Sequence, residues 1–365
     1  MGSFLLANHF SDKKMDLPSQ VVQSLRWFES LFLEDTVIEL RITPNLEIKT
    51  LTAEPENTKP NYLHTEVGSR HVCVDTSLGE LKYKKVGDIY TWTDEDDVYH
   101  VSDKAPTEGK FELFNYAGEK IFDYFTLDLN TDSLPYDFNQ KLTVKLNKLF
   151  ELYGKLLDKT SLKKVDINLR VYQSKTAFQK IKNQHNMPIS NKSDGFYSHR
   201  NNQAYLLFKN NERTMSTATH EATHAINRAI IGYTPKWLNE GLAEYSENIQ
   251  VQGKSATVYP DKNWTHKNII SAKLLPLSTL FSVKNNQWNS SIRRQLYATS
   301  WAFIYFMMEH PDRKSILARI IKKEQQNICN TINSDQLEIQ LGMPITSLQK
   351  QFSSWSKEKV KRQSI

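Results

Sequence analysis

Residues 214–231 read TMSTATHEATHAINRAII and contain the pattern His-Glu-x-x-His. His220 and His224 are four residues apart, so on a helix they lie on one face, one turn from each other. That spacing lets both imidazoles reach one metal ion at about 2.0–2.1 Å. An apolar stripe on the opposite side of the segment supports a helix, and Gly232 follows where a helix commonly ends. The pattern therefore predicts a helix with a two-histidine metal-binding face.

A second helix is predicted at residues 235–247, which read PKWLNEGLAEYSE. Its leucines and its tyrosine make one apolar face, and Glu240 and Glu244 share another. A catalytic zinc site takes three protein ligands and leaves one position open. We therefore expect Glu240 to be the third ligand. We expect Glu244, one turn later, to accept a hydrogen bond from a ligand histidine and fix its tautomer.

Glu221 lies beside the metal-binding face of the first helix, where it can take a proton from a water whose pKa the metal lowers to about 7. The alternative is a helix with two exposed histidines. It does not explain why a second helix with paired carboxylates follows after a short turn. The residues therefore predict one Zn2+ per chain with Glu221 as general base.

These two segments resemble the gluzincins, the HExxH metallopeptidases whose third ligand is a downstream glutamate. WLNEGLAEY is similar to the aminopeptidase pattern W-L-N-E-G-x-A, with Glu240 at the ligand position. Residues 135–365 also resemble a bacterial group of peptidase MA-like proteins, in which the two motifs follow a Gly-Phe-Tyr strand, here Gly195–Tyr197. The resemblance implies a zincin-like fold and a zinc peptidase. The aminopeptidase G-x-M-E-N motif is absent, so exopeptidase activity is not implied.

The same resemblance names three supporting residues. Gluzincins often use a tyrosine from the helical lobe as a donor to the oxyanion, and Tyr297 is placed like that residue; the alternative is a packing tyrosine. In zincins the strand before the HExxH helix pairs with an extended substrate backbone. Tyr197 and His199 on residues Gly195–Arg200 are therefore expected to face the substrate, although a lone histidine on a strand is more often a surface or packing residue.

The N-terminal part contains a predicted hairpin. The β-prone runs Ile89–Thr93 and Val98–Ser102 flank an acidic turn, residues 94–97. The hairpin resembles a small β-module found near the N-terminus of many bacterial envelope proteins. The resemblance rests on Tyr90, Trp92, Asp94, Ser102, Asp103 and Pro106. It implies an envelope or periplasmic location, but the chain shows no evident signal peptide, so a cytoplasmic location stays open. Cys73 and Cys329 either pair or stay reduced.

The order of predicted elements favours an α+β class with three parts. Residues 1–60 form a helical segment at 19–34 and a linker at 52–61, residues 61–130 form the β-module, and residues 131–365 form the zincin-like domain. In the third part we expect a small sheet with an edge strand, the HExxH helix and then a helical lobe. The sheet elements are a strand at 165–172, a helix at 174–184 capped by Ser174, and strands Gly195–Arg200 and Gln203–Lys209 joined by a turn at Asn201–Asn202.

Composition excludes two other classes of protein. The net charge is +6, and basic residues are interleaved with acidic ones except in the tail at Lys357–Arg362. We therefore expect no nucleic-acid partner, and no run is long and apolar enough for a membrane span. The prediction is a zinc-dependent peptidase acting on a peptide or protein substrate. The alternative is a catalytically idle zinc-binding scaffold or a peptide-binding protein of the envelope. Substrate preference and oligomeric state stay open.

Overall fold

The computed structural model has the mixed α+β class that the sequence predicts. Several sequence-based predictions fall outside the residues that it describes: the helix at 19–34, the linker at 52–61, the turn at 94–97 and the pairing state of Cys73. The described residues are 75–82, 89–93, 99–102, 112–114, 122–131, 133–187, 193–253, 255–262, 274–326 and 329–365.

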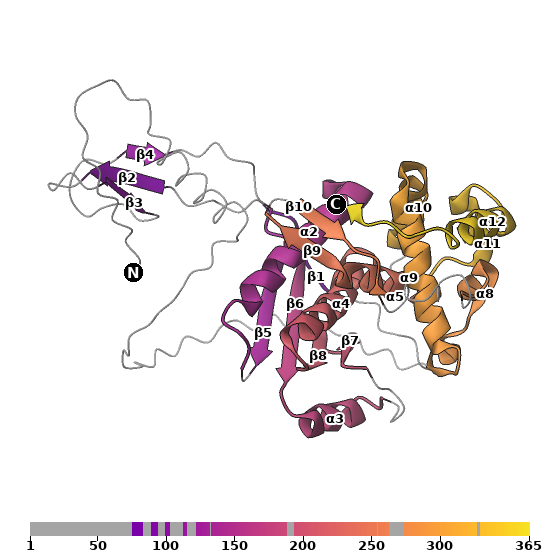
Figure 1. Ribbon diagram of the computed structural model, residues 1–365, viewed down its shortest axis with the longest axis horizontal. Helices are drawn as coiled ribbons and strands as arrows, with labels where there is room; N and C mark the ends of the chain where they lie inside the picture. The colour runs from indigo at the N-terminus through magenta and orange to yellow at the C-terminus, as the bar shows by residue number, and fades with distance from the viewer. Residues whose placement is uncertain are drawn as a thin grey trace.

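The main sheet has β6 (Lys163–Tyr172) at its centre. β6 pairs in parallel with β5 (Phe125–Thr131) and β8 (Gln203–Leu207), and antiparallel with β1 (Ser77–Glu80). Every second residue of β6 from Val165 to Val171 is buried, as expected for a strand with helices packed on it. β7 (Gly195–Ser198) pairs antiparallel with β8 and lies at the edge of this sheet (Figure 1).

The β7–β8 hairpin is shorter than predicted. Its strands end at Ser198 and Leu207 rather than at Arg200 and Lys209. The turn contains Asn202 with a φ of 48°, a left-handed conformation that asparagine adopts more readily than most residues. The Tyr197 hydroxyl donates to Asn202 Oδ1 at 2.6 Å, which ties the end of the strand to the turn.

Helices cover both faces of this sheet. α4 (Asn211–Ile230) packs on β6, β7 and β8, and α2 (Phe138–Leu157) packs beside it. On the other side lies α3 (Lys175–Gln184), which begins as predicted because the Ser174 hydroxyl accepts a hydrogen bond from the backbone of Ala177 at 3.3 Å. The α3 side has its own small apolar cluster of Phe178, Phe196, Tyr205 and Leu207.

A helical lobe follows the sheet. α5 (Lys236–Glu247) packs on α4 and on the buried helix α9 (Arg293–Glu309), which is apolar on nearly all sides. The lobe also contains α8 (Leu277–Ser282), α10 (Pro311–Gln325), α11 (Ser334–Leu341) and α12 (Ile345–Trp355). A small second sheet consists of β9 (Ile249–Gln252), β10 (Ser255–Val258) and β11 (Gln363–Ser364).

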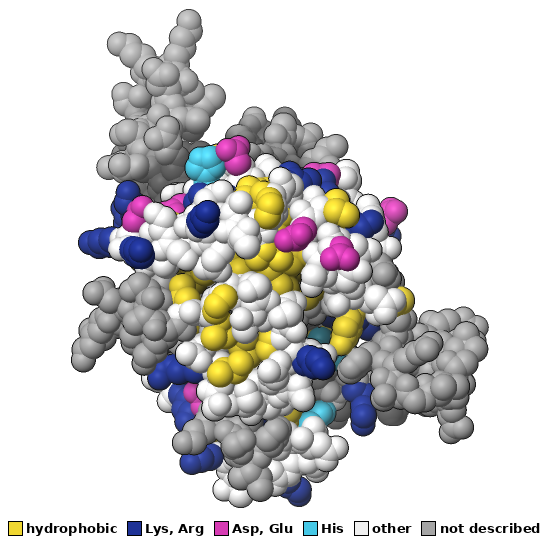
Figure 2. All heavy atoms as spheres, turned by 90° about the vertical axis from the view of Figure 1, so that its right-hand side faces the viewer, with side chains coloured by type: hydrophobic (Ala, Val, Ile, Leu, Met, Phe, Trp, Pro, Cys, Tyr) yellow, Lys and Arg dark blue, Asp and Glu magenta, His cyan; other side chains and the backbone are white. Residues whose placement is uncertain are grey.

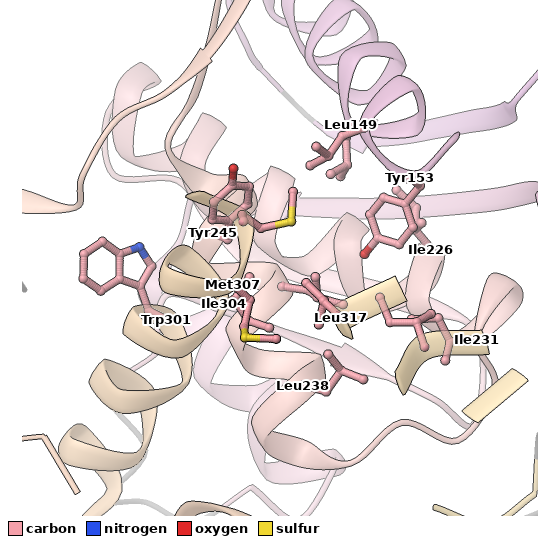
Figure 3. Close-up of a cluster of buried hydrophobic side chains, with 14 of the residues drawn as sticks. Leu149, Tyr153, Ile226, Ile231, Leu238, Tyr245, Trp301, Ile304, Met307 and Leu317 are labelled. Atoms are coloured by element: carbon pink, nitrogen blue, oxygen red, sulfur yellow. The ribbon is translucent and has the colours of Figure 1, made fainter. Parts of the chain in front are cut away.

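One continuous core joins the sheet to the helical lobe. Figure 3 shows Leu149 and Tyr153 from α2, Ile226 from α4, Leu238 from α5 and apolar residues of α9 in this cluster. All of these side chains are at most 1 % exposed. The metal-binding helices α4 and α5 are therefore fixed from behind by packing, which is what a rigid site needs.

The N-terminal hairpin is confirmed in outline. β2 (Ile89–Thr93) pairs antiparallel with β3 (Tyr99–Ser102) and also with β4 (Glu112–Phe114). Among the described residues, these strands do not pair with the other two sheets. The domain limits stay predictions, but β1 and all of β5 except Thr131 lie within residues 61–130 and pair with β6, so part of this range contributes to the main sheet.

Acidic and basic side chains are interspersed on the surface of the helical lobe, as Figure 2 shows for the side that faces right in Figure 1. The basic tail at residues 357–362 lies between α12 and β11 rather than at the end of a helix. Within the described part of the chain, no helix is long and apolar enough to cross a bilayer.

Candidate metal centre

His220 and His224 lie on the buried face of α4, 8 % and 7 % exposed. Their rings are nearly perpendicular, with centroids 4.8 Å apart. Three threonines on the same helix, Thr217, Thr219 and Thr223, donate to the carbonyl four residues earlier. Each of these buried hydroxyls therefore has a hydrogen-bond partner within the helix. The polar segment can be buried without the free-energy cost of hydroxyl groups that lack a hydrogen bond.

Glu240 reaches both histidines from α5, as predicted. Its Oε2 lies 3.5 Å from His220 Nε2 and 3.7 Å from His224 Nε2. Two such ligands on one tetrahedral zinc ion, each at about 2.0–2.1 Å, would be about 3.3–3.4 Å apart. Glu240 Oε2 is also buried and makes no hydrogen bond within the described residues. An oxygen that is buried without a donor and faces two imidazole nitrogens fits a metal ligand, so the cluster could hold a metal ion.

Glu221 lies on the same side of α4, with its Oε2 4.0 Å from His224 Nε2. The edge strand β7 fits against it because residue 195 is glycine. A Cβ at Gly195 would lie 2.9 Å from Glu221 Oε1 and 2.6 Å from Thr217 Cγ2. Gly195 therefore lets β7 approach the Glu221 carboxylate closely. This explains why the first residue of the Gly-Phe-Tyr motif is glycine.

The residue that orients His220 differs from the prediction. We predicted Glu244 for this place, but the partner of His220 Nδ1 is Glu247, with its Oε1 at 2.6 Å. Glu247 is two turns after Glu240 on α5. The imidazole ring of His220 lies between these two side chains, with Nε2 facing Glu240 and Nδ1 facing Glu247. Glu244 lines the same cavity and lies close enough to His220 and Glu247 to share an ion with them.

A buried polar chain leads to His224 from the other side. Tyr153 donates to Asn227 Oδ1, and Asn227 Nδ2 donates to Asn239 Oδ1 at 2.8 Å. Asn239 in turn interacts with His224. Tyr153, Asn227 and Asn239 were not among the predicted site residues. The only signal was their position: Asn227 is three residues after His224, and Asn239 directly precedes the expected third ligand.

Glu221 and Glu240, which both lie beside the histidines, have opposite electrostatic environments. Burial raises the pKa of Glu221 to about 8, and the nearby charges of Glu240 and Glu247 add to the shift, against the opposing effect of His220. Burial would also raise the pKa of Glu240, but His224, His220 and Lys236 outweigh it and lower that pKa to about 2. Glu240 is thus held ionised, as a ligand must be, while Glu221 more readily holds a proton.

The cluster opens into a cavity of about 1450 Å3 that both β7 and the helical lobe line. Tyr297 of α9 lies on its wall, and the described contacts of its ring include an edge-on contact with Trp288. Burial, together with the charge of Glu240, raises the pKa of Tyr297 well above its ordinary value, against the effect of Arg293. Tyr297 therefore keeps its proton, while its role as a hydrogen-bond donor to the oxyanion stays a prediction.

Tyr197 and His199 also line this cavity. The Tyr197 ring centroid is 6.4 Å from that of His224, and His199 packs edge-on against Tyr197 at 4.9 Å. His199 is exposed and lies just after the end of β7. The structure thus places both residues beside the metal-ligand cluster, while a role in binding substrate stays a prediction.

The model of a family described as a protein of unknown function (DUF1570) matches residues 214–328. The match begins with α4 and contains α5 and α9, so it includes every residue of the metal cluster and Tyr297. No curated protein matches the chain.

Proposed function

We propose that this protein is a zinc-dependent peptidase of the gluzincin type with a zincin-like fold. The observation that carries the proposal is the buried Glu240 Oε2, which has no hydrogen-bond partner among the described residues and faces both His220 Nε2 and His224 Nε2. Two imidazoles and one carboxylate are the ligand set of catalytic zinc sites that keep an open position.

The donor set fits zinc. His220, His224 and Glu240 would hold the ion, with Glu247 fixing the tautomer of His220 through Nδ1. A divalent cation would also offset the excess of carboxylates around the two imidazoles. Bound there, zinc would supply Lewis-acid polarisation of a carbonyl and a lowered pKa for water.

The protein's own residues would handle the proton and the substrate. Glu221, on the cavity wall beside His224, would take a proton from the attacking water and pass it to the leaving amine. Its raised pKa suits a group that must hold that proton during the reaction. Tyr297 would donate to the developing oxyanion, and the edge of β7 that pairs with no described strand would align an extended peptide backbone.

We further propose that the enzyme works in the bacterial envelope. This proposal rests on the resemblance of the N-terminal hairpin and on one structural observation. Cys329 is disulfide-bonded. Disulfides persist in oxidising compartments such as the periplasm and are rare in the cytosol.

A peptide-library cleavage assay with the zinc-loaded protein tests the activity. Glu221→Gln should reduce turnover by about 10²- to 10⁴-fold, since it removes the general base but keeps the shape of the side chain. Glu212→Gln, an exposed glutamate on the same helix, is the matched control and should leave turnover unchanged. Equal turnover by wild type and Glu221→Gln would contradict the proposal and favour an idle zinc-holding scaffold.

A further inference from the structure

Lys236 and Arg293 occupy equivalent positions on the two helices that bear the site. Lys236 is the first residue of α5, one turn before Glu240, and Arg293 is the first residue of α9, one turn before Tyr297. Residues four apart on a helix share a face. Both cations line the same cavity as the metal cluster, on the wall formed by the helical lobe.

These two cations act on each other. Burial lowers the pKa of Lys236, and the charge of Arg293 lowers it further, against the opposing effect of Glu240. The Arg293 guanidinium lies over the Tyr297 ring, 5.3 Å from its centroid. Two half-buried like charges held together are unfavourable unless an anion joins them.

The carboxylate whose charge offsets that of Lys236 is Glu240, which also faces both ligand histidines. Within the described part of the chain, neither Lys236 nor Arg293 forms a close ion pair with a carboxylate, whereas Asp194 on the opposite wall pairs with Lys209 at 3.4 Å and with Arg213 at 3.5 Å. With Glu240 engaged by a metal ion, an anion of the substrate can interact with Lys236 and Arg293.

We propose that Lys236 and Arg293 form a subsite for a carboxylate of the substrate, close to the scissile bond. Cβ atoms one helical turn apart are about 5–6 Å from each other, so Lys236 is near the ligand Glu240. An extended peptide advances about 3.3 Å per residue, so the bound carboxylate belongs to a substrate residue within about two positions of the cleaved bond. Arginine's planar fork matches a carboxylate in two-point geometry. The inference rests on the proposed function and names its substrate class.

The carboxylate can belong to an acidic side chain or to the C-terminus of a peptide. Quenched fluorescent peptides distinguish the two sources. One set carries glutamate or glutamine at each of the two positions on either side of the cleaved bond. A second set carries a free or an amidated C-terminus two residues after that bond. The probe pairs are equal in size, so a difference in kcat/KM reports the charge.

We expect wild type to prefer one member of these pairs by at least about 10-fold, as a charge-assisted hydrogen bond would give. In Lys236→Met and Arg293→Met the preference should fall to within about two-fold, whereas Lys236→Arg should keep most of it because the charge remains. Lys350→Met, an exposed lysine on α12, is the control and should retain the full preference. A wild-type enzyme that cleaves charged and neutral probes equally would overturn the proposal, as would a preference that survives both Met variants.

A binding measurement keeps this outcome separate from failure of the proposed activity. Fluorescein-labelled versions of the same peptide pairs are titrated into zinc-loaded Glu221→Gln protein and followed by fluorescence polarisation. If wild type cleaves none of the peptides, the proposed peptidase activity is contradicted, but the proposed carboxylate subsite is not. Tighter binding of a carboxylate probe that is lost in Glu221→Gln/Lys236→Met would still support the subsite, and equal binding of charged and neutral probes would refute it.

Discussion

The two faces of α5 have opposite chemical character: one is acidic and faces the cavity, and the other is apolar and packs on α9. One face carries Glu240 and Glu247 into the cavity, where they surround the imidazoles of α4. The other face carries Gly241 against Ser300 and Ile304 of α9, and Leu238 is part of the same apolar core. Buried carboxylates gathered around two histidines are costly to a folded protein that has no cation to bind them, while close apolar packing stabilises it. The apolar face of α5 therefore fixes the position of the acidic face, and the acidic face serves function rather than stability.

Two glycines mark the two faces and give matched variants. Gly195 lies against Glu221 at the cavity, and Gly241 lies against α9, where a Cβ would be 2.8 Å from the carbonyl oxygen of Ser300 and 2.6 Å from Ile304 Cγ1. The same change to alanine should therefore damage activity at one position and stability at the other.

The largest effect is expected from Gly195→Ala on activity. The added methyl group would collide with Thr217 and with the Glu221 carboxylate, so the base moves or the strand retreats. A displacement on the order of 1 Å at a catalytic group costs about 100-fold in rate. Measuring kcat/KM on the best library peptide checks this, with circular dichroism to show that the fold is intact. Full activity in this variant would show that the position of Glu221 does not matter.

The second prediction concerns Glu324, a buried glutamate that, unlike Glu240, has no basic side chain beside it among the described residues. Burial raises the pKa of Glu324 on α10 to about 7, although the backbone N–H of Ile332 donates to it. Because this pKa is raised from 4.5, the stability that the protonated group provides is lost as the pH rises from about 4.5 to 7. Between pH 5 and pH 8 the loss is about 2–3 kcal/mol.

Glu324→Gln removes this titration while keeping an oxygen for Ile332. The melting temperature of the variant should therefore rise relative to wild type as the pH increases from 5 to 8. Thermal unfolding across this range measures the difference. Parallel curves for the two proteins would mean that Glu324 titrates normally in the fold.

Gly241→Ala should destabilise the protein by about 1–2 kcal/mol. The methyl group meets backbone that cannot move cheaply, which costs about 1–3 kcal/mol, and the better helix propensity of alanine returns at most about 1 kcal/mol. Denaturant unfolding gives the value, and kcat/KM of the folded fraction should stay near wild type. A loss of activity without a loss of stability would erase the distinction between the two faces.

The smallest expected change is in metal affinity on Glu247→Gln. Partners of a ligand histidine typically matter by 10- to 100-fold, and glutamine keeps an acceptor oxygen for His220 Nδ1, so we expect about 10-fold weaker zinc binding. Competition with a chromophoric chelator measures the affinity. The same experiment on Glu244→Gln is the comparison, and a larger effect there would restore Glu244 as the orienting residue.

The three metal-ligand candidates could be predicted from the sequence. Helical spacing alone puts His220 and His224 on one face, and a short connection brings Glu240 near them. It also predicted β6, α3 and the β2–β3 hairpin, whose signals are local. Glu247 was missed because its contact depends on how α4 and α5 cross, which spacing within one helix does not determine. The Tyr153–Asn227–Asn239 chain joins three separate helices and was invisible for the same reason.

Metal content of the purified protein tests the central claim most directly. Wild type, dialysed after zinc loading and analysed by mass spectrometry of the metal, should contain about one zinc per chain, while His224→Ala should contain almost none. Circular dichroism of His224→Ala must show a folded protein. Zinc that remains at one per chain in folded His224→Ala, or zinc that is absent from loaded wild type, would contradict the metal centre on which the proposed chemistry depends.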